Sequence, residues 1–370
     1  MARLVDVCSI QYGFPFDSSK FSDSEGMPLI RIRDVTRGYS ETYTTEPYKD
    51  DYVVKENDLL IGMDGEFNIA KWGHSPALLN QRVCRLFPKA NIDRDYLYYF
   101  MPTALKKIES KTPFVTVKHL SAKELNKIEL DIPSMETQKK IASTMCTIDT
   151  LKKHYEQQLT KLDELVKARF VEMFGNRNYP CESLINLVLD GTSLSYGIVQ
   201  PGNDGTGDMG VLRPVDIVDG KLTMSSIKYI DRSIGEGFKK TELTGDELLI
   251  TVRGTTGITA LTDSRFTGMN VTRGIAVVRY NRKKINPLYL NAYFNTDESQ
   301  RYIQEHTRGA TLQQINLSDL RVQQIMLPPL SLQNQFAAFV EEVDKSKVEV
   351  QKALDQTQLL FDSLMQQYFG

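Results

Sequence analysis

Apolar residues recur with spacings of three, four or seven along two long stretches of the chain. The first series is Ile141, Met145, Ile148, Tyr155, Leu159, Leu162, Val166 and Phe170, and the second is Phe336, Val340, Val343, Val350, Leu354, Phe361 and Met365. In the second series Thr357 stands where the first has Leu162. A seam sustained over about 40 residues predicts a coiled-coil-like helix of roughly 60 Å.

Each helix is expected to begin after a proline. Pro133 and Pro328 disfavour helix on their N-terminal side, and Ser134 or a neighbour can cap the first helix. Both helices could be ordinary core elements, but compact domains rarely need helices of this length. We therefore expect them to pair as a rigid spacer or partner-binding element. Its contact positions would be Ile141, Ile148, Tyr155, Leu159, Val343, Val350 and Leu354.

The two helical stretches belong to a repeat. An offset of 195 positions (320 − 125) aligns Thr116–Gly175 with Thr311–Gly370 without a gap. Upstream, "LIRIRDVTRG" from Leu29 matches "VLRPVDIVDG" from Val211, and "NDLLIGMDG" matches "DELLITVRG". The identical aligned pairs include Leu125 and Leu320, Pro133 and Pro328, Gln138 and Gln333, Asp149 and Asp344, and Phe174 and Phe369.

A repeat of this size is a whole domain and not a solenoid unit. Each half is a β-rich segment with a basic middle, followed by a long helix. The expected fold is α+β, with two β-rich domains related by pseudo-two-fold symmetry and joined by the two helices. The expected boundaries are 1–132 and 176–327 for the domains, and 133–175 and 328–370 for the helices.

Composition narrows the class of protein. A chain of 370 residues, 41% hydrophobic and 25% charged, suits a globular protein of two or more domains. No run of eighteen apolar residues and no signal-peptide core is present, so we expect a cytoplasmic protein. Four scattered cysteines and four histidines make a zinc site or a disulfide framework improbable.

Charge is distributed unevenly. The net charge of −2 argues against a free-standing protein that coats DNA. From Phe67 to Ile92, however, there are four basic residues and no acidic one, and from Leu248 to Thr296 there are seven basic residues against Asp263 alone. A solvated face explains either strip taken alone. Both strips fall at the same place in the repeat, which favours a shared binding role.

The sequence contains short strings that match catalytic or nucleotide-binding motifs, but their surroundings do not fit those motifs. "GTGDMG" at 205–210 satisfies G-x-G-x-x-G, but it lies between a loop and a predicted strand, without a helix to bind phosphate. The chain has no P-loop motif, and its four histidines lack a nucleophile or carboxylate at motif spacing. We expect no active site, no metal and no cofactor in this chain.

Together these features resemble the specificity subunit of type I restriction–modification systems. The resemblance rests on the joint "IPSMETQKKIA" and "LPPLSLQNQFA", on the long helices that end in Phe-Gly, and on the half-repeat. It covers essentially the whole chain. The family often has an acidic residue before the helix-starting glutamine, where this chain has Thr137 and Leu332.

The resemblance implies a non-enzymatic DNA reader in host defence. Two target-recognition domains would each bind half of a split, asymmetric target in double-stranded DNA, and the helices would pack antiparallel to fix the gap. Two modification subunits would methylate adenine with S-adenosylmethionine, and two restriction subunits would complete the nuclease. S-adenosylmethionine, ATP and magnesium would be bound by those partners.

Arginine, glutamine and asparagine are the side chains that read base edges in the major groove. The candidate DNA contacts in the first half are Asn68, Lys71, Gln81, Arg82 and Arg85, and those in the second are Arg213, Arg253, Asn270 and Arg273. Arg31 and Arg213 match across the repeat, and salt bridges to Asp34 and Asp216 explain them equally well. The single tryptophan, Trp72, is expected in the core.

Three alternatives remain open from the sequence. The chain could serve another restriction–methylation class, act as a helical scaffold between two protein-binding domains, or contain an unrecognised catalytic domain. DNA binding through phosphates should weaken steeply with salt, whereas protein docking need not. Turnover by the purified chain would be required for the catalytic alternative.

Overall fold

The computed structural model describes every residue except 75, 112–117, 176–177, 206 and 311, and it divides into two compact units. Unit 1 consists of Met1–Glu156 and Lys352–Gly370, and unit 2 consists of Gln157–Gln351. The first aligned residues of the repeat, Thr116 and Thr311, lie outside the described residues. None of the described helices is both long and apolar enough to cross a membrane.

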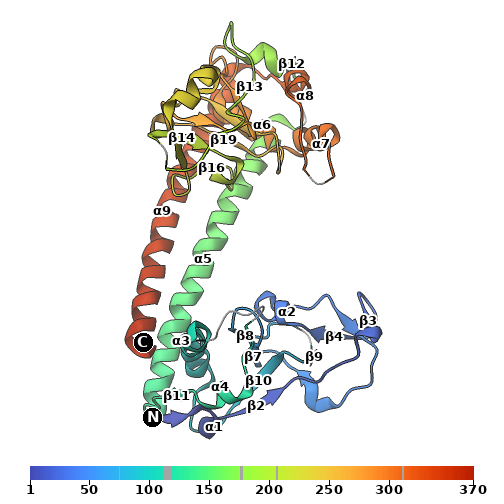
Figure 1. Cartoon of the computed structure of the whole chain (residues 1–370), viewed down its shortest axis with the longest axis vertical. Helices are drawn as coiled ribbons and strands as arrows, with labels where there is room; N and C mark the ends of the chain where they lie inside the picture. The colour runs from blue at the N-terminus through green and yellow to red at the C-terminus, as the bar shows by residue number, and fades with distance from the viewer. Residues whose placement is uncertain (75, 112–117, 176–177, 206, 311) are drawn as a thin grey trace. The chain divides into compact units, whose positions relative to one another are not determined.

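Unit 1 is built around two sheets (Figure 1). The antiparallel sheet has the order β2 (Cys8–Tyr12), β10 (Val83–Pro88), β7 (Leu59–Gly62), β8 (Asn68–Lys71). The mixed sheet has the order β3 (Phe21–Ser22), β5 (Tyr43–Thr44), β4 (Met27–Ile30), β9 (Ala77–Leu79), β6 (Val53–Val54). A small sheet pairs β1 (Ala2–Arg3) with β11 (Glu129–Leu130). The helices are α1 (Leu4–Val7), α2 (Ile32–Arg37), α3 (Arg94–Lys111) and α4 (Ala122–Asn126).

Unit 2 repeats this plan. Its antiparallel sheet has the order β13 (Ser195–Tyr196), β21 (Ile275–Val278), β18 (Leu248–Thr251), β19 (Thr259–Leu261). A second sheet has the order β17 (Lys228–Ile230), β14 (Met209–Leu212), β20 (Asn270–Val271). Two small sheets pair β12 (Cys181–Ser183) with β22 (Gln324–Met326) and β15 (Ile217–Val218) with β16 (Lys221–Leu222). The helices are α6 (Pro287–Phe294), α7 (Asp297–His306) and α8 (Leu317–Val322).

The two units share the topology that the repeat predicts. In each, a four-stranded antiparallel sheet keeps the same order, and a parallel pair, β4 with β9 or β14 with β20, lies in the second sheet. In each unit the first strand also pairs with the strand that precedes the long helix. The α+β fold with two β-rich domains and two long helices is therefore confirmed.

The long helices are α5 (Met135–Phe174) and α9 (Leu330–Phe369), each of 40 residues. They begin two residues after the expected boundaries (135 − 133 and 330 − 328), and the division between the compact units falls inside each helix, after 156 and after 351. Every expected contact position is buried or half-buried. Thr357 is tolerated in the seam because its hydroxyl donates to the carbonyl of Ala353 at 2.7 Å.

Within unit 2 the helices run antiparallel. The ring of Phe170 lies 5.4 Å from that of Phe336, near the end of α5 and the start of α9. Further along α9, Lys347 forms an ion pair of 2.7 Å with Asp163, which lies earlier in α5. Since Lys347 is largely buried, this pair adds a specific polar contact to the apolar seam.

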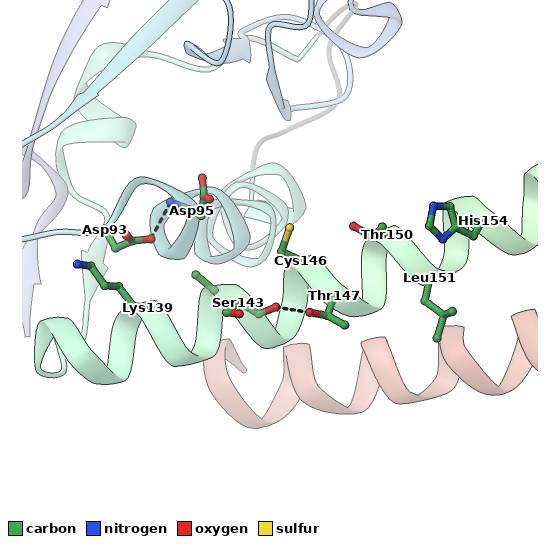
Figure 2. Close-up of a pocket in the computed structure, with 10 residues that line it drawn as sticks. Asp93, Asp95, Lys139, Ser143, Cys146, Thr147, Thr150, Leu151 and His154 are labelled. Carbon is green, nitrogen blue, oxygen red and sulfur yellow. Dashed lines mark hydrogen bonds between the residues drawn. The ribbon is translucent and has the colours of Figure 1, made fainter.

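One glutamine at the start of each long helix fixes the loop before an earlier helix of the same unit, α3 or α6. In unit 1, Oε1 of Gln138 accepts from the backbone N–H of Asp93 at 2.7 Å, and Nε2 donates to the carbonyl of Pro133 at 2.9 Å. Asp93 in turn caps α3, because its Oδ1 accepts from the N–H of Asp95 at 3.0 Å (Figure 2). The glutamine thus joins the proline turn, the long helix and the cap of α3.

Unit 2 builds the same joint. Oε1 of Gln333 accepts from the N–H of Asn286 at 2.8 Å, and Nε2 donates to the carbonyl of Pro328 at 2.8 Å. Asn286 caps α6 through its bond from the N–H of Leu288. Gln138 and Gln333 are 1% and 0% exposed, so neither amide can replace these bonds with water.

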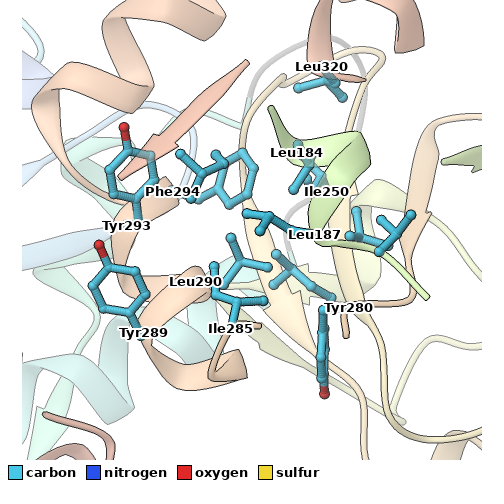
Figure 3. Close-up of a cluster of buried hydrophobic side chains, with 14 of the residues drawn as sticks. Leu184, Leu187, Ile250, Tyr280, Ile285, Tyr289, Leu290, Tyr293, Phe294 and Leu320 are labelled. Carbon is cyan, nitrogen blue, oxygen red and sulfur yellow. The ribbon is translucent and has the colours of Figure 1, made fainter. Parts of the chain in front are cut away.

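The core of unit 2 receives the ends of both long helices. Figure 3 shows aromatic and aliphatic side chains of this core, including Tyr289, Tyr293 and Phe294 of α6. The ring of Phe174, at the end of α5, lies 5.0 Å from that of Tyr289. The hydroxyl of Tyr293 donates to the carbonyl of Gln324 at 3.0 Å, and burial raises its pKa to about 12. The helix end is therefore part of the domain core.

Replacing either clamp glutamine should weaken its unit. We expect Gln138→Ala to lower the free energy of unfolding by about 2 kcal/mol, because the N–H of Asp93 and the carbonyl of Pro133 would both lose the buried amide that they bind. Gln333→Ala should do the same through Asn286. The measurement is urea unfolding followed by circular dichroism, with Gln157→Ala on the exposed face of α5 as the matched control. An equal effect of the control would contradict the clamp.

The four cysteines should divide into two reactivity classes. Burial raises the pKa of Cys8 to about 11 and that of Cys84 to about 12, so both remain protonated and inaccessible at pH 8. Cys146 and Cys181 are free and exposed. Mass spectrometry after brief iodoacetamide treatment of the native chain should find two modified thiols, and four after unfolding. Rapid modification of Cys84 in the native chain would show that the core of unit 1 is open.

Candidate nucleic-acid interface

Gly13 and Gly197 lie where the chain passes very close to a neighbouring turn. A Cβ atom on Gly13 would lie 2.0 Å from the carbonyl oxygen of Asn80, and one on Gly197 would lie 1.8 Å from that of Val271. No side chain fits at such a distance, so both positions require glycine. The Tyr-Gly dipeptide found in both halves therefore marks a close approach to the corresponding turn in each unit, displaced by one residue between the two.

In unit 1 the residue after this glycine is hydrogen-bonded to the turn between β9 and β10. The N–H of Phe14 donates to the carbonyl of Leu79 at 3.0 Å, and the N–H of Gln81 donates to the carbonyl of Phe14 at 2.9 Å. The side chain of Gln81 is exposed, and its amide has no partner among the residues that the structure describes. The backbone is thus fixed while the side chain is available.

In unit 2 the equivalent hydrogen bonds hold the turn between β20 and β21. The N–H of Ile198 donates to the carbonyl of Val271 at 2.8 Å, and the N–H of Arg273 donates to the carbonyl of Ile198 at 2.9 Å. Arg273 is exposed, and within the described part of the chain its guanidinium has no ion-pair or hydrogen-bond partner. Arg273 therefore occupies the place of Gln81.

A second loop lies against this turn in each unit. In unit 1 the N–H of Met63 donates to the carbonyl of Arg82 at 2.9 Å, and the N–H of Gly65 donates to that of Lys118 at 2.9 Å. Gly65 has a positive φ of 77°, which explains the glycine there. Asp64 is held between these two bonds.

Unit 2 forms the equivalent bonds. The N–H of Val252 donates to the carbonyl of Gly274 at 2.8 Å, and the N–H of Gly254 donates to that of Gln313 at 2.9 Å. Gly254 likewise has a positive φ, of 84°. The residue held between the two bonds is Arg253, so an arginine takes the place of the carboxylate in unit 1.

These equivalent positions differ in charge. In unit 1, Oδ1 of Asp64 lies 2.5 Å from Nδ1 of His119, and Oδ2 lies 3.6 Å from Nε of Arg82. An ionised carboxylate only accepts, so Nδ1 of His119 is the donor. In unit 2, Arg253 is half-buried and has no acidic partner among the described residues. Unit 1 therefore presents a neutralised cluster, and unit 2 presents an uncompensated cation.

Arg85 is among the predicted DNA contacts, but the structure buries it. Its side chain is 5% exposed, and Nη1 binds the carboxylate of Asp58 and the carbonyl of Val53 at 2.8 and 2.7 Å. Nη2 donates to Gln11 and to the carbonyl of Asp51, both at 2.6 Å. With its donors occupied, Arg85 serves to join the two sheets of unit 1 and cannot reach DNA in this structure.

Asn270 and Arg213 also have structural partners. Asn270 is 0% exposed, donates to the carbonyl of Phe238 at 3.1 Å and accepts from the hydroxyl of Thr241 at 2.8 Å. Arg213 donates to the buried carboxylate of Asp216 through Nε and Nη2, both at 3.1 Å. The prediction of DNA contact does not fit Asn270, and for Arg213 the structure has the alternative salt bridge.

The remaining candidates lie on β8 of unit 1. Lys71 is half-buried, pairs with Asp95 at 3.1 Å and lies 4.7 Å from the ring centre of Tyr98. Asn68 is half-buried and donates to the carbonyl of Glu66 at 3.1 Å. Trp72, which follows this strand, is 2% exposed, so its expected place in the core is confirmed. Of the predicted contacts, Gln81 and Arg273 lie at equivalent places in the two turns. Arg82 lies beside Gln81 in unit 1, and Arg253 lies in the loop that is bonded to the turn of unit 2.

Three residues at the turn of unit 1 were not among the candidates. Asp64 and His119 complete the cluster with Arg82, and Phe14 is 38% exposed beside Gln81. The repeat contained a signal for two of them, because "YGF" and "NDLLIGMDG" each have a counterpart in the second half. The aligned strings show where the loops are equivalent, but not which side chains are exposed.

A shallow hollow runs along α5 in unit 1. Figure 2 shows Lys139, Cys146 and His154 of α5 on one side and Asp93 and Asp95, at the start of α3, on the other. No group of three potential metal-binding side chains occurs among the described residues. The hollow is open to solvent, and no hydrogen bond between a cysteine or serine and a base is present in it among the described residues.

Removing Arg85 should affect stability. We expect Arg85→Ala to lower the free energy of unfolding by about 3 kcal/mol, because Asp58 and Gln11 would lose a partner that is itself buried. Arg82→Ala, on the exposed neighbouring turn, should change it by less than about 0.5 kcal/mol. Urea unfolding of both variants makes the comparison. Equal, small effects would return Arg85 to the candidate contacts.

Comparison with known proteins gives matches over most of the chain. The profile of the family described as "Type I restriction modification DNA specificity domain" matches residues 1–161 and 206–357. The chain is 30% identical to the type I restriction enzyme EcoBI specificity subunit of Escherichia coli, over 98% of this chain and 84% of that protein.

Two solved structures share the fold. An S subunit of a type I restriction–modification system from M. genitalium aligns with a TM-score of 0.59 and 11% identity, over 100% of this chain and 95% of that one. A chain from a structure described as the "complex assembly" and "conformational transition of the type I R-M system" aligns with a TM-score of 0.55 and 16% identity, over 100% and 96%.

Proposed function

The chain belongs to the type I restriction modification DNA specificity family, and we propose from this premise that it reads a split DNA sequence through its two units. In that family it is a DNA-recognition subunit, and the catalytic activities belong to other subunits. The alternative of a scaffold without DNA contact is not favoured.

The observation that carries the proposal is the turn that occurs once in each unit. The same backbone bonds hold Gln81 in unit 1 and Arg273 in unit 2, and both side chains are exposed. Rigid backbone with a free amide or guanidinium is what direct readout of a base edge needs. Two such turns on one chain match a target with two half-sites.

The paired helices would fix the register between the half-sites. Half-sites read from one face of the duplex must be separated by about one helical turn, ~34 Å, or a multiple of it. A helix pair held by an apolar seam and by the Lys347–Asp163 ion pair resists bending, so it suits this task. The length of the helices would then determine the gap that the target tolerates.

Partners would supply the chemistry. We propose two modification subunits and two restriction subunits, which would bind S-adenosylmethionine, ATP and magnesium themselves. Exposed apolar side chains on the helices, Leu151 of α5 and Leu359 and Leu360 of α9, offer area for such docking. The net charge of −2 also fits a chain that relies on partners for much of the phosphate attraction.

The first test is methylation in cells. Cells that express the chain with the modification subunit of its own system should carry adenine methylation at a split motif, read by genome-wide sequencing. Exchanging residues 1–115 for those of another specificity chain should change one half of the motif and leave the other half intact. The unexchanged chain is the control.

The outcome decides between reader and scaffold. A motif that depends on the chain, with one half following the exchange, supports recognition by separate units. If the modification subunit is active and no motif depends on the chain, the scaffold alternative replaces the reader.

Binding of the complex to DNA should also weaken steeply between low and moderate salt, because phosphate contacts release counterions.

A further inference from the structure

We propose, on the basis of the function above, that the two units read different bases at one equivalent position. Unit 2 would read a guanine through Arg273, and unit 1 would read an adenine through Gln81. Neither base is given by membership in the family. The two turns are held by the same backbone hydrogen bonds, and they differ in the side chains that they carry.

The two turns are geometrically equivalent. In each unit the turn residue donates its N–H to the residue after the required glycine, at 2.9 Å for both Gln81 and Arg273. The turn itself is tied to the second loop by bonds of 2.9 Å in unit 1 and 2.8 Å in unit 2. With the backbone held in the same way, the two side chains face the same position of their respective half-sites.

The side chains at the two turns differ in the base edges that they can bind. An arginine forms two parallel hydrogen bonds to O6 and N7 of guanine, both of which are acceptors. A glutamine amide donates to N7 of adenine and accepts from its N6 amino group. Gln81 and Arg273 are uncommitted in the described structure, so each can make its bidentate contact without breaking an existing bond.

The surroundings of the turn in unit 1 carry no uncompensated cation. Asp64 lies 3.6 Å from the guanidinium of Arg82 and 2.5 Å from His119. A neutralised cluster adds no positive charge that would favour the two acceptors of guanine, so the choice of base is left to the amide of Gln81.

An aromatic side chain in unit 1 points to the same base pair. Phe14 is 38% exposed although its ring lies 5.0 Å from that of Phe16 and 5.4 Å from that of Tyr52. These neighbours support the ring from within and leave one part in solvent. Phe14 forms a β-bridge to Asn80, next to Gln81, and an apolar group there suits the methyl group of thymine.

In unit 2 the surroundings favour guanine. Arg253 takes the place of Asp64 and adds a second cation beside the turn that holds Arg273. Its neighbour Gln314 forms a β-bridge to it through the backbone and brings no negative charge. Two guanidinium groups near one base edge match the acceptor-rich edge of guanine, and they discriminate against the amino group of adenine.

The test uses the complex of the chain with its modification subunit and synthetic duplexes of the mapped target. Each guanine in the half-site of unit 2 is replaced in turn by 7-deazaguanine, which lacks the N7 acceptor. We expect one replacement to weaken binding by the wild-type complex about tenfold. The same replacement should weaken the Arg273→Gln complex less than about twofold, because the contact is already lost.

A parallel series replaces adenines in the half-site of unit 1 by 7-deazaadenine and compares wild type with Gln81→Ala. For the guanine series in unit 2, Arg265→Gln is the matched control, because it removes an exposed arginine that lies in the same basic strip as Arg273 but is paired with Asp263 at 2.7 Å. That variant should keep the wild-type response at every base. The wild-type series requires no substitution in the protein, so it stands even if a variant fails to fold.

The outcomes separate this inference from the proposed function. Absence of any chain-dependent motif overturns the function itself. A motif with no sensitive guanine in the half-site of unit 2, or a sensitivity that persists unchanged in Arg273→Gln, overturns the assignment of Arg273 and leaves the reader intact. The same two results with adenine and Gln81→Ala overturn the assignment in unit 1.

Discussion

The buried amide of Gln138, repeated by Gln333, is the interaction on which the organisation of this chain depends. Each amide joins the proline turn at the start of a long helix to the capping residue of an earlier helix of the same unit, α3 or α6. A single side chain satisfies backbone groups from both elements, away from water. The helix and its β-domain are thereby held at a fixed angle, as a recognition surface with a defined register requires.

Constant backbone and variable side chains form the second level of organisation. The close approach of a glycine to the turn and the hydrogen bonds around the turn occur in both units, whereas Gln81 is matched by Arg273 and Asp64 by Arg253. Base identity is read by side chains, so a fixed frame can carry a new preference with few substitutions. Under the proposed function, one fold used twice in one chain would in this way bind two different half-sites.

The sequence predicts the large elements well and the role of single polar residues less well. Helical spacing, prolines and the repeat were sufficient for α5, α9 and the two domains, because each depends on many residues at once. Arg85 could not be placed, since it lies in a strand whose neighbours Cys84 and Leu86 are also buried and gives no alternation to follow. Its partners Asp58 and Gln11, the second of which lies opposite it on the paired strand β2, are distant in sequence.

The basic strip of unit 2 shows why the counting of charges misleads. Arg265 pairs with Asp263 inside the strip, and Arg282 pairs with Asp246 just before it. Arg279 likewise lies 3.6 Å from Glu247, so three of the seven bases are compensated. The other four, Arg253, Arg273, Lys283 and Lys284, have no acidic partner in the described structure, and the two arginines among them lie in the turn frame. Lysines without acidic partners can bind phosphate regardless of sequence, so under the proposed function discrimination between sequences would depend on the side chains at the two turns.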